Sequence, residues 1–252
     1  MMGFNERVHA YIAAKYYVYL TEKFGDNGKD AFLLATRHYA EQRGRRMAER
    51  AVRDGQPLTY ETYCKYGEWD STGEITARGE ANKSEVVTLA PDYETHIFSC
   101  PWAAQFKDMG LSDAGALYCR DLDASICRGF NPAIHYKTTQ TLYDHPYCIQ
   151  IIRNSGLAGD ERPVKRPEGI RPFSYHCGHS YYAYREVVIG IYGENGKEIA
   201  AKVLTDFETD YGLEMSRELV SFANTNFNIA DENLVFLNQG ISCLFSTQKM
   251  PK

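Results

Sequence analysis

The sequence lacks the long apolar run and the apolar leader that would place a chain in or across a membrane. No stretch approaches the roughly 18 apolar residues that a membrane-spanning helix needs. Residues 1–7 read Met-Met-Gly-Phe-Asn-Glu-Arg and carry no apolar core of the kind found in secretory signals. We therefore expect a cytoplasmic protein that does not bind membranes.

Positive charge is also scarce, since 28 Lys and Arg stand against 33 Asp and Glu and the net charge is −5. No basic stripe with interleaved aromatics appears, so nucleic acid is not an expected partner. The short basic stretches 43–46 and 162–171 are flanked by acids and are interpreted as a solvated helix end and a linker. A small-molecule substrate is the expected partner, and a homo-oligomer is compatible with this composition.

The cysteines form no Cys-x-x-Cys pair, which argues against a structural zinc site. Their number is odd and they are spread over a long chain, whereas secreted disulfide frameworks are short, dense and usually even. We expect most of them to be reduced and buried, with one or two available for chemistry. The seven positions are Cys64, Cys100, Cys119, Cys127, Cys148, Cys177 and Cys243.

Three common enzyme motifs are missing. The chain has no Gly-x-Ser-x-Gly elbow, no glycine loop ending in Gly-Lys-Ser/Thr and no His-Glu-x-x-His helix. Residues 25–29 superficially resemble a phosphate-binding loop, but their spacing is wrong. The high content of 19 Tyr suits the walls of a small-molecule pocket, although a tyrosine-rich core would explain it equally well.

One helical unit occurs twice. Residues 25–31 read Gly-Asp-Asn-Gly-Lys-Asp-Ala, and residues 193–199 read Gly-Glu-Asn-Gly-Lys-Glu-Ile. The same offset of 168 relates four further pairs: Tyr16 and Tyr184, Phe24 and Tyr192, Gly44 and Gly212, and Met47 and Met215. Agreement over about 35 residues indicates an internal repeat. The alternative is that the two segments share only a common sequence for one kind of turn.

Each copy is predicted to be a helical hairpin, over residues 5–53 and 173–224. Apolar residues at helical spacing predict helices over 6–24 and 28–53 in the first copy, with Gly25 as the cap between them. The second copy predicts helices over 175–192 and 196–224.

Between the copies, residues 84–153 change to the period-two pattern of half-buried strands. Strands are predicted over 86–89, 93–99, 133–141 and 147–152, and helices over 101–109 and 115–129. Residues 154–172 are predicted to be a linker or mobile loop, and 234–237 and 243–245 are predicted edge strands. The expected fold is a single α+β domain over residues 1–252, with a central antiparallel sheet flanked by the two helical hairpins.

The middle block holds the first candidate catalytic residues. Cys100 lies where a strand ends and a helix begins, so the helix dipole is expected to lower its pKa and favour thiolate. Cys119 and Asp123 are four residues apart on a helix and share one face. Asp123 is predicted to bind an amidinium-like nitrogen or to act as a base. A solvated helix with a structural thiol is the alternative reading.

Histidines supply the candidate acids and bases. His145 is predicted at a turn just before Cys148, and His176 and His179 are three residues apart on a helix. One of the three is expected to transfer protons. The further predicted substrate-binding residues are Cys119, Asp121, Cys148 and Trp102. No cofactor is expected, because the long spacings between these cysteines and histidines do not support a metal site.

The order of these segments resembles the L-2-amino-thiazoline-4-carboxylic acid hydrolase family. The resemblance rests on six stretches, which are 44–48, 65–69, 95–103, 117–123, 129–132 and 145–148. It implies hydrolysis of a carbon–nitrogen bond in a small cyclic amidine, by attack of a thiol or of an activated water. A non-catalytic sensor domain, similar to vinyl-reductase-like domains, and a metal-dependent hydrolase are the alternatives.

Overall fold

A computed structural model describes residues 3–158 and 162–230. Its α-helices are α1 Glu6–Phe24, α2 Asp26–Arg53, α3 Tyr60–Lys65, α4 Gly73–Ala77, α5 Pro101–Asp108, α6 Ser112–Phe130, α7 Phe173–Tyr192, α8 Glu194–Tyr211 and α9 Leu213–Ser221. Its strands are β1 Lys83–Thr88, β2 Tyr93–Ser99, β3 His135–Gln140 and β4 Cys148–Arg153, and its 3-10 turns are η1 Pro167–Gly169 and η2 Phe222–Asn224. The α+β class with an antiparallel sheet is confirmed. The predicted strands 234–237 and 243–245 lie outside the described residues.

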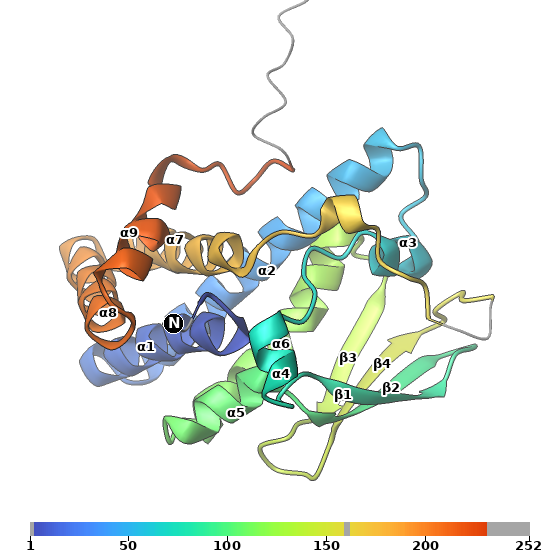
Figure 1. The fold of residues 1–252 in the computed structure, drawn as a ribbon, viewed down its shortest axis with the longest axis horizontal. Helices are drawn as coiled ribbons and strands as arrows, with labels where there is room; N and C mark the ends of the chain where they lie inside the picture. The colour runs from blue at the N-terminus through green and yellow to red at the C-terminus, as the bar shows by residue number, and fades with distance from the viewer. Residues whose placement is uncertain (1–2, 159–161, 231–252) are drawn as a thin grey trace, which may run out of the picture.

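The four strands form one antiparallel sheet in the order β1-β2-β4-β3. Figure 1 shows this sheet at one end of the molecule and the helices α1, α7, α8 and α9 at the other, with α2 running between the two parts. No helix of the described residues is both long enough and apolar enough to cross a membrane.

The repeat predicted from the sequence is a structural repeat. Gly25 and Gly193 each join two helices and adopt almost the same backbone, with φ of 57° and 56°. A Cβ on Gly28 would lie 2.1 Å from the carbonyl oxygen of Leu20, and one on Gly196 would lie 2.3 Å from that of Val188. Glycine is required at both turns for the same reason, because the second helix starts against the backbone of the first.

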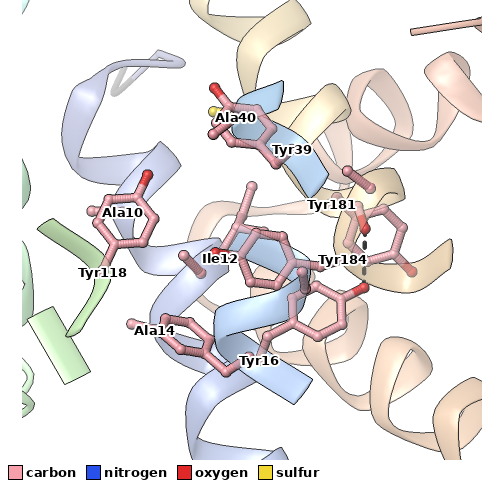
Figure 2. Packing of buried hydrophobic residues seen from close by; sticks show 14 of the residues in the cluster. Ala10, Ile12, Ala14, Tyr16, Tyr39, Ala40, Tyr118, Tyr181 and Tyr184 are labelled. Atoms are coloured by element: carbon pink, nitrogen blue, oxygen red, sulfur yellow. Dashed lines mark hydrogen bonds between the residues drawn. The ribbon is translucent and has the colours of Figure 1, made fainter. Parts of the chain in front are cut away.

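The two hairpins pack about a pseudo-two-fold axis. Phe24 stacks on its own counterpart Tyr192, with ring centroids 3.8 Å apart, and Tyr16 packs on its counterpart Tyr184 at 5.2 Å. The Tyr16 hydroxyl also donates to the carbonyl oxygen of Tyr181, as Figure 2 shows within the buried cluster. Residues that contact their own equivalents lie on or near a two-fold axis. The tyrosines therefore build the helical core.

The second copy departs from the prediction at its end. A single helix over 196–224 was expected, but α8 stops at Tyr211 and α9 begins at Leu213. Gly212 lies between them with φ 88° and ψ 162°, a conformation that is open to glycine and not to a continuing helix. Its counterpart Gly44 lies inside the uninterrupted helix α2.

Gly44 is where α2 crosses α6. A Cβ on Gly44 would come within 2.0 Å of the carbonyl oxygen of Ile126, and one on Gly129 within 2.4 Å of that of Glu41. The two backbones thus touch at reciprocal glycines. This close approach fixes α6, and with it Cys119 and Asp123, against α2.

The basic stretch 43–46 is not a solvated helix end, and that interpretation was wrong. The Arg46 side chain is fully buried and Arg43 is 8% exposed, while Arg45 faces solvent. The described part of the predicted linker 154–172 is held by backbone hydrogen bonds from Arg166 to Lys65 and from Arg171 to Glu68. Both segments therefore contribute to the packed structure beside the sheet.

Candidate functional site

A cavity separates the inner face of the sheet from α2 and α6. It consists of two adjoining chambers of about 300 and 90 Å³, here called the large chamber and the small chamber. Six residues line both of them, namely Arg43, Trp69, Asn82, Ile97, Asp123 and Gln150. Because these residues form the boundary, a ligand atom between the chambers would be within reach of both acidic and basic side chains.

The sheet contributes a row of polar side chains to the cavity. Thr95, Gln150 and Thr138 are direct cross-strand partners on β2, β4 and β3, so their side chains share one face. Gln150 lies between the chambers, with Thr95 in the large one and Thr138 in the small one. The hydroxyls of Thr95 and Thr138 are buried and have no hydrogen-bond partner among the described residues. Buried hydroxyls are ordinarily satisfied, so this row is suited to bind a polar ligand.

Asp123 is the acid of the cavity. It lies on α6 and accepts a hydrogen bond of 2.9 Å from Nε2 of Gln150. Burial raises the pKa of its carboxyl group, while the charge of Arg43 and the hydrogen bond from Gln150 act in the opposite direction. A carboxyl group with a raised pKa gains and loses a proton nearer to neutral pH than an exposed one.

Three thiols form one wall of the small chamber: Cys100, Cys119 and Cys148. Cys100 occupies the N-cap position of α5, and backbone amides of Trp102 and Ala103 favour its thiolate. Burial nevertheless raises its pKa to about 12. The expectation that the helix dipole would produce a thiolate was wrong, because desolvation outweighs the local amides.

The other two thiols are also protonated. Burial raises the pKa of both Cys119 and Cys148. The Cys119 thiol donates to the hydroxyl of Tyr143 across 3.8 Å, and the sulfur of Cys148 accepts from the backbone amide of Leu142 at 3.1 Å. The thiol wall is therefore neutral and weakly polar.

Arg43 is the cation at the boundary between the chambers. Its Nε atom is buried and has no hydrogen-bond partner among the described residues. The carboxylate of Glu68 lies 4.0 Å from it, beyond hydrogen-bonding distance. Arginine binds carboxylates through two parallel hydrogen bonds, so Arg43 is suited to hold an anionic group of a ligand.

Glu68 is buried behind the cavity wall and forms its hydrogen bonds with Arg46 and Arg50, not with Arg43. It receives two hydrogen bonds from Arg46, at 3.1 and 2.8 Å, and one of 2.6 Å from Arg50. Burial opposes its ionisation, but the charges of Arg46 and Arg50 prevail and lower its pKa. Arg43, Arg46 and Arg50 follow one another at helical spacing on α2, and the carboxylate holds the last two by hydrogen bonds while it lies 4.0 Å from Arg43.

A family model matches residues 5–148, under the description L-2-amino-thiazoline-4-carboxylic acid hydrolase. This range covers more than half of the chain. The chain belongs to this family. No curated protein and no solved structure matches it. The matched range contains Arg43, Cys100, Cys119 and Asp123 and ends at Cys148, so the thiol wall of the small chamber lies within the part of the chain shared with the family.

The histidines predicted as acids or bases lie outside the cavity lining. His145 is half exposed in a turn, where its Nδ1 lies 3.1 Å from Asp144. His176 donates from Nε2 to the backbone carbonyl of Glu68 at 3.0 Å, and burial lowers its pKa to about 3. The turn that carries His145 and the buried helix α7 that carries His176 and His179 place all three side chains away from the small chamber and its thiols.

His179 is held neutral by its two partners. Its Nδ1 faces the guanidinium of Arg46 at 3.2 Å, and a guanidinium can only donate. Its Nε2 therefore carries the proton and donates to Gln42 at 2.8 Å. Burial lowers the pKa of His179 further. Its role in the described structure is to connect α7 to α2.

The remaining predicted residues divide between the cavity and the surface. Trp102 lines the small chamber and donates from Nε1 to Nδ1 of His9 at 3.0 Å. Asp121 pairs with Arg37 on another side of α6. Among the described residues, no group of three or more His, Cys, Asp or Glu side chains could hold a metal ion.

Sequence reasoning missed Arg43, Gln150 and Lys165, which all line the large chamber. Arg43 could have been found from its spacing to Arg46 and Arg50, because three arginines on one helical face predict a shared anion. Gln150 gave no comparable signal, since a single polar residue in an apolar strand is common. Its importance comes from its contact with Asp123.

Proposed function

We propose that the chain hydrolyses the ring carbon–nitrogen bond of a cyclic amidine, such as 2-amino-thiazoline-4-carboxylate. The observation that carries the proposal is that Asp123 and Arg43, a carboxyl group and a guanidinium cation, line both chambers beside the protonated thiol wall. A cyclic amidine with a carboxylate presents the complementary pair of charges on one small ring. The description of the family supports the same class of substrate.

In this proposal Arg43 binds the substrate carboxylate and Asp123 binds the protonated amidine. The hydrogen bonds from the amidinium to Asp123 hold the ring and keep its C2 atom electrophilic. Cys100, Cys119 and Cys148 contribute a neutral wall, and Trp102 closes the chamber. Such a wall excludes bulk water and strengthens the charged contacts within it.

Water is the preferred nucleophile, because the Cys100 thiol has a pKa of about 12 and is protonated. Water adds to C2 and gives up a proton to Asp123. The C2–nitrogen bond of the ring then breaks as Asp123 returns that proton to the departing nitrogen, and the C2 hydroxyl becomes the carbonyl by losing its own proton to the Asp123 carboxylate. One carboxyl group serves as base and then as acid, and its raised pKa suits both steps. Attack by the Cys100 thiol is the competing route.

Asp123→Asn and Cys100→Ser test this mechanism. Asp123→Asn should lower kcat by about 100-fold or more, because the amide cannot accept the proton. Cys100→Ser should stay within about tenfold of wild type. Cys177→Ala, a buried cysteine of α7 that lines neither chamber, is the control for folding. Asp123→Asn turning over substrate within about tenfold of wild type would refute the proton-transfer role, and a larger loss in Cys100→Ser than this would favour thiol attack.

The products identify the bond that breaks. Cleavage between C2 and the ring nitrogen leaves the carbamoyl group on sulfur, so no free thiol appears. Cleavage between C2 and sulfur releases a thiol, which a disulfide reagent detects. Product mass with no early thiol signal is expected, whereas stoichiometric thiol release would overturn the carbon–nitrogen assignment.

A small-molecule sensor is the second candidate, and one observation favours it. All three thiols of the small chamber are held in the unreactive protonated form by burial. A sensor would bind the ring and leave it intact. Mass spectrometry of the ligand after incubation distinguishes the two, since the hydrolase adds one water to it.

A further inference from the structure

The large chamber exceeds what the proposed reaction needs. The reacting ring with one amino and one carboxylate group is accounted for by the small chamber and the shared boundary. The large chamber adds about 300 Å³, which alone reaches the size of pockets that bury drug-sized ligands. Its polar lining indicates that the large chamber binds a polar part of the ligand other than the reacting ring.

Cations outnumber acids on the chamber walls. Arg43, Arg162 and Lys165 line it, and the acids that line it are Asp70 and Asp123. Asp123 is assigned to the amidine, and the side chain of Asp70 is 77% exposed. Of the three cations Arg43 is buried, Lys165 is partly buried and Arg162 is exposed, and an anionic group in the chamber would gain charge-assisted hydrogen bonds from them.

Lys165 retains free donors toward the chamber. Its ammonium group donates to the backbone carbonyl of Trp69 at 2.7 Å and lies over the Trp69 ring at 4.6 Å. Asp70 is 3.9 Å away, too far for a hydrogen bond. An ammonium group has three N–H donors, and the described residues accept one of them, so two can point to water or to a ligand.

Thr95 supplies an independent sign of a missing polar partner. It is 4% exposed, it lines the large chamber, and its hydroxyl has no partner among the described residues. Thr138 is its equivalent in the small chamber, on the other side of Gln150. The row Thr95–Gln150–Thr138 therefore extends ligand-binding capacity into both chambers.

We infer that the large chamber is a second subsite, which receives an arm of the substrate that ends in a carboxylate. The arm leaves the amidine near Asp123, crosses the boundary beside Arg43, and ends near Lys165 and Arg162. This inference rests on the proposed hydrolysis of the ring in the small chamber. It changes the expected substrate class from a bare ring to a ring with an acidic side arm.

Two synthetic substrates test the subsite. One is 2-amino-thiazoline-4-carboxylate with a carboxypropyl arm on the exocyclic nitrogen, and the other is its carboxamide twin, which has the same shape and no charge. Wild-type kcat/KM should be about tenfold higher for the acidic twin, because a charge-assisted hydrogen bond is lost in the amide. Equal kcat/KM values for the two twins would overturn the inference.

Variants locate the effect. Lys165→Met and Arg162→Gln should each bring the ratio between the twins toward one, whereas Thr138→Val in the small chamber should keep it near tenfold. Thermal melting of each variant separates misfolding from loss of the ratio. A ratio that stays near tenfold in both folded cation variants would contradict the assignment of the anion to this chamber.

The experiments distinguish failure of the proposed hydrolysis from failure of the second subsite. If the unextended ring is hydrolysed and the twins do not differ, the subsite is refuted and the proposed function stands. If no ring is hydrolysed, the proposed function fails and the twins stay intact for titration. The two tryptophans, Trp69 and Trp102, both line the cavity, so their fluorescence reports binding there. Tighter binding of the acidic twin, abolished by Lys165→Met, would then support the subsite, and equal binding would refute it.

Discussion

The two helical hairpins begin alike and end differently. Both turn at a glycine with positive φ, and both place a second glycine against the backbone of the preceding helix. In the first copy, the second helix continues through Gly44 to Arg53 and forms a wall of the cavity. In the second copy, the corresponding helix breaks at Gly212, directly after Tyr211, which is the counterpart of the cavity-lining Arg43.

The same residue type permits opposite outcomes because the neighbours differ. Gly44 is pressed against α6, so the missing side chain allows close helix packing. Gly212 has no atom within 4 Å of the position of a Cβ, and its backbone freedom is used to end the helix. A glycine in a repeat therefore has no fixed role, and the element that packs on it decides whether the helix continues.

The charges beyond these glycines have diverged as well. Arg46 and Arg50 of the first copy correspond to Glu214 and Glu218 of the second, which are exposed. Only the first copy has Glu68 beneath it to neutralise buried arginines. One copy thus lines the cavity, while the other supports the helical core.

Glu68→Gln should produce the largest effect, because it removes the buried charge that distinguishes the first copy. It leaves Arg46 and Arg50 buried without a carboxylate, which costs about 3–5 kcal/mol of the free energy of unfolding. Denaturant unfolding measures the loss. Glu214→Gln, the matched change at an exposed acid of the second copy, should stay within about 0.5 kcal/mol. A loss below about 1 kcal/mol for Glu68→Gln would show that the arginine row does not depend on it.

Gly44→Ala should have the next largest effect and should also lower activity. Its Cβ would lie 2.0 Å from the carbonyl oxygen of Ile126, so α2 and α6 must separate, at a cost of about 1–3 kcal/mol. Their separation moves Arg43 away from Asp123, so KM should rise in a folded variant. Gly212→Ala strains only a backbone with φ 88° and should destabilise without changing KM. Equal KM changes in the two variants would contradict a special role of the α2–α6 crossing.

Local patterns predicted the repeat and the sheet, because helical and strand periodicities depend only on the order of apolar and polar residues within a short segment. They failed at Gly212, where a glycine can end a helix or remain within one. They also failed for Arg43 and Arg46, which have acids nearby in the sequence but are buried beside Glu68 in three dimensions. Burial of an arginine depends on distant partners, so composition alone assigns it to solvent.

The candidate site was predictable in its residue types and not in its electrostatics. Cys100, Cys119, Cys148 and Asp123 were selected from separate segments, and they line one chamber. The thiol pKa was predicted in the wrong direction, because a helix N-terminus is visible in the sequence and desolvation is not. The role of Gln150 depends on strand register, because the register of β4 determines whether the Gln150 side chain contacts Asp123 on α6.

The smallest predicted effect concerns the pseudo-two-fold axis itself. Phe24 and Tyr192 stack at 3.8 Å, with 6° between their planes, at the far end of both hairpins. A double-mutant cycle with Phe24→Leu and Tyr192→Leu should give a coupling of about 0.5–1.5 kcal/mol in the free energy of unfolding. Because the pair lies away from the cavity, KM should not change in either variant. Purely additive losses would mean that the two copies are held together elsewhere, through Tyr16 and Tyr184.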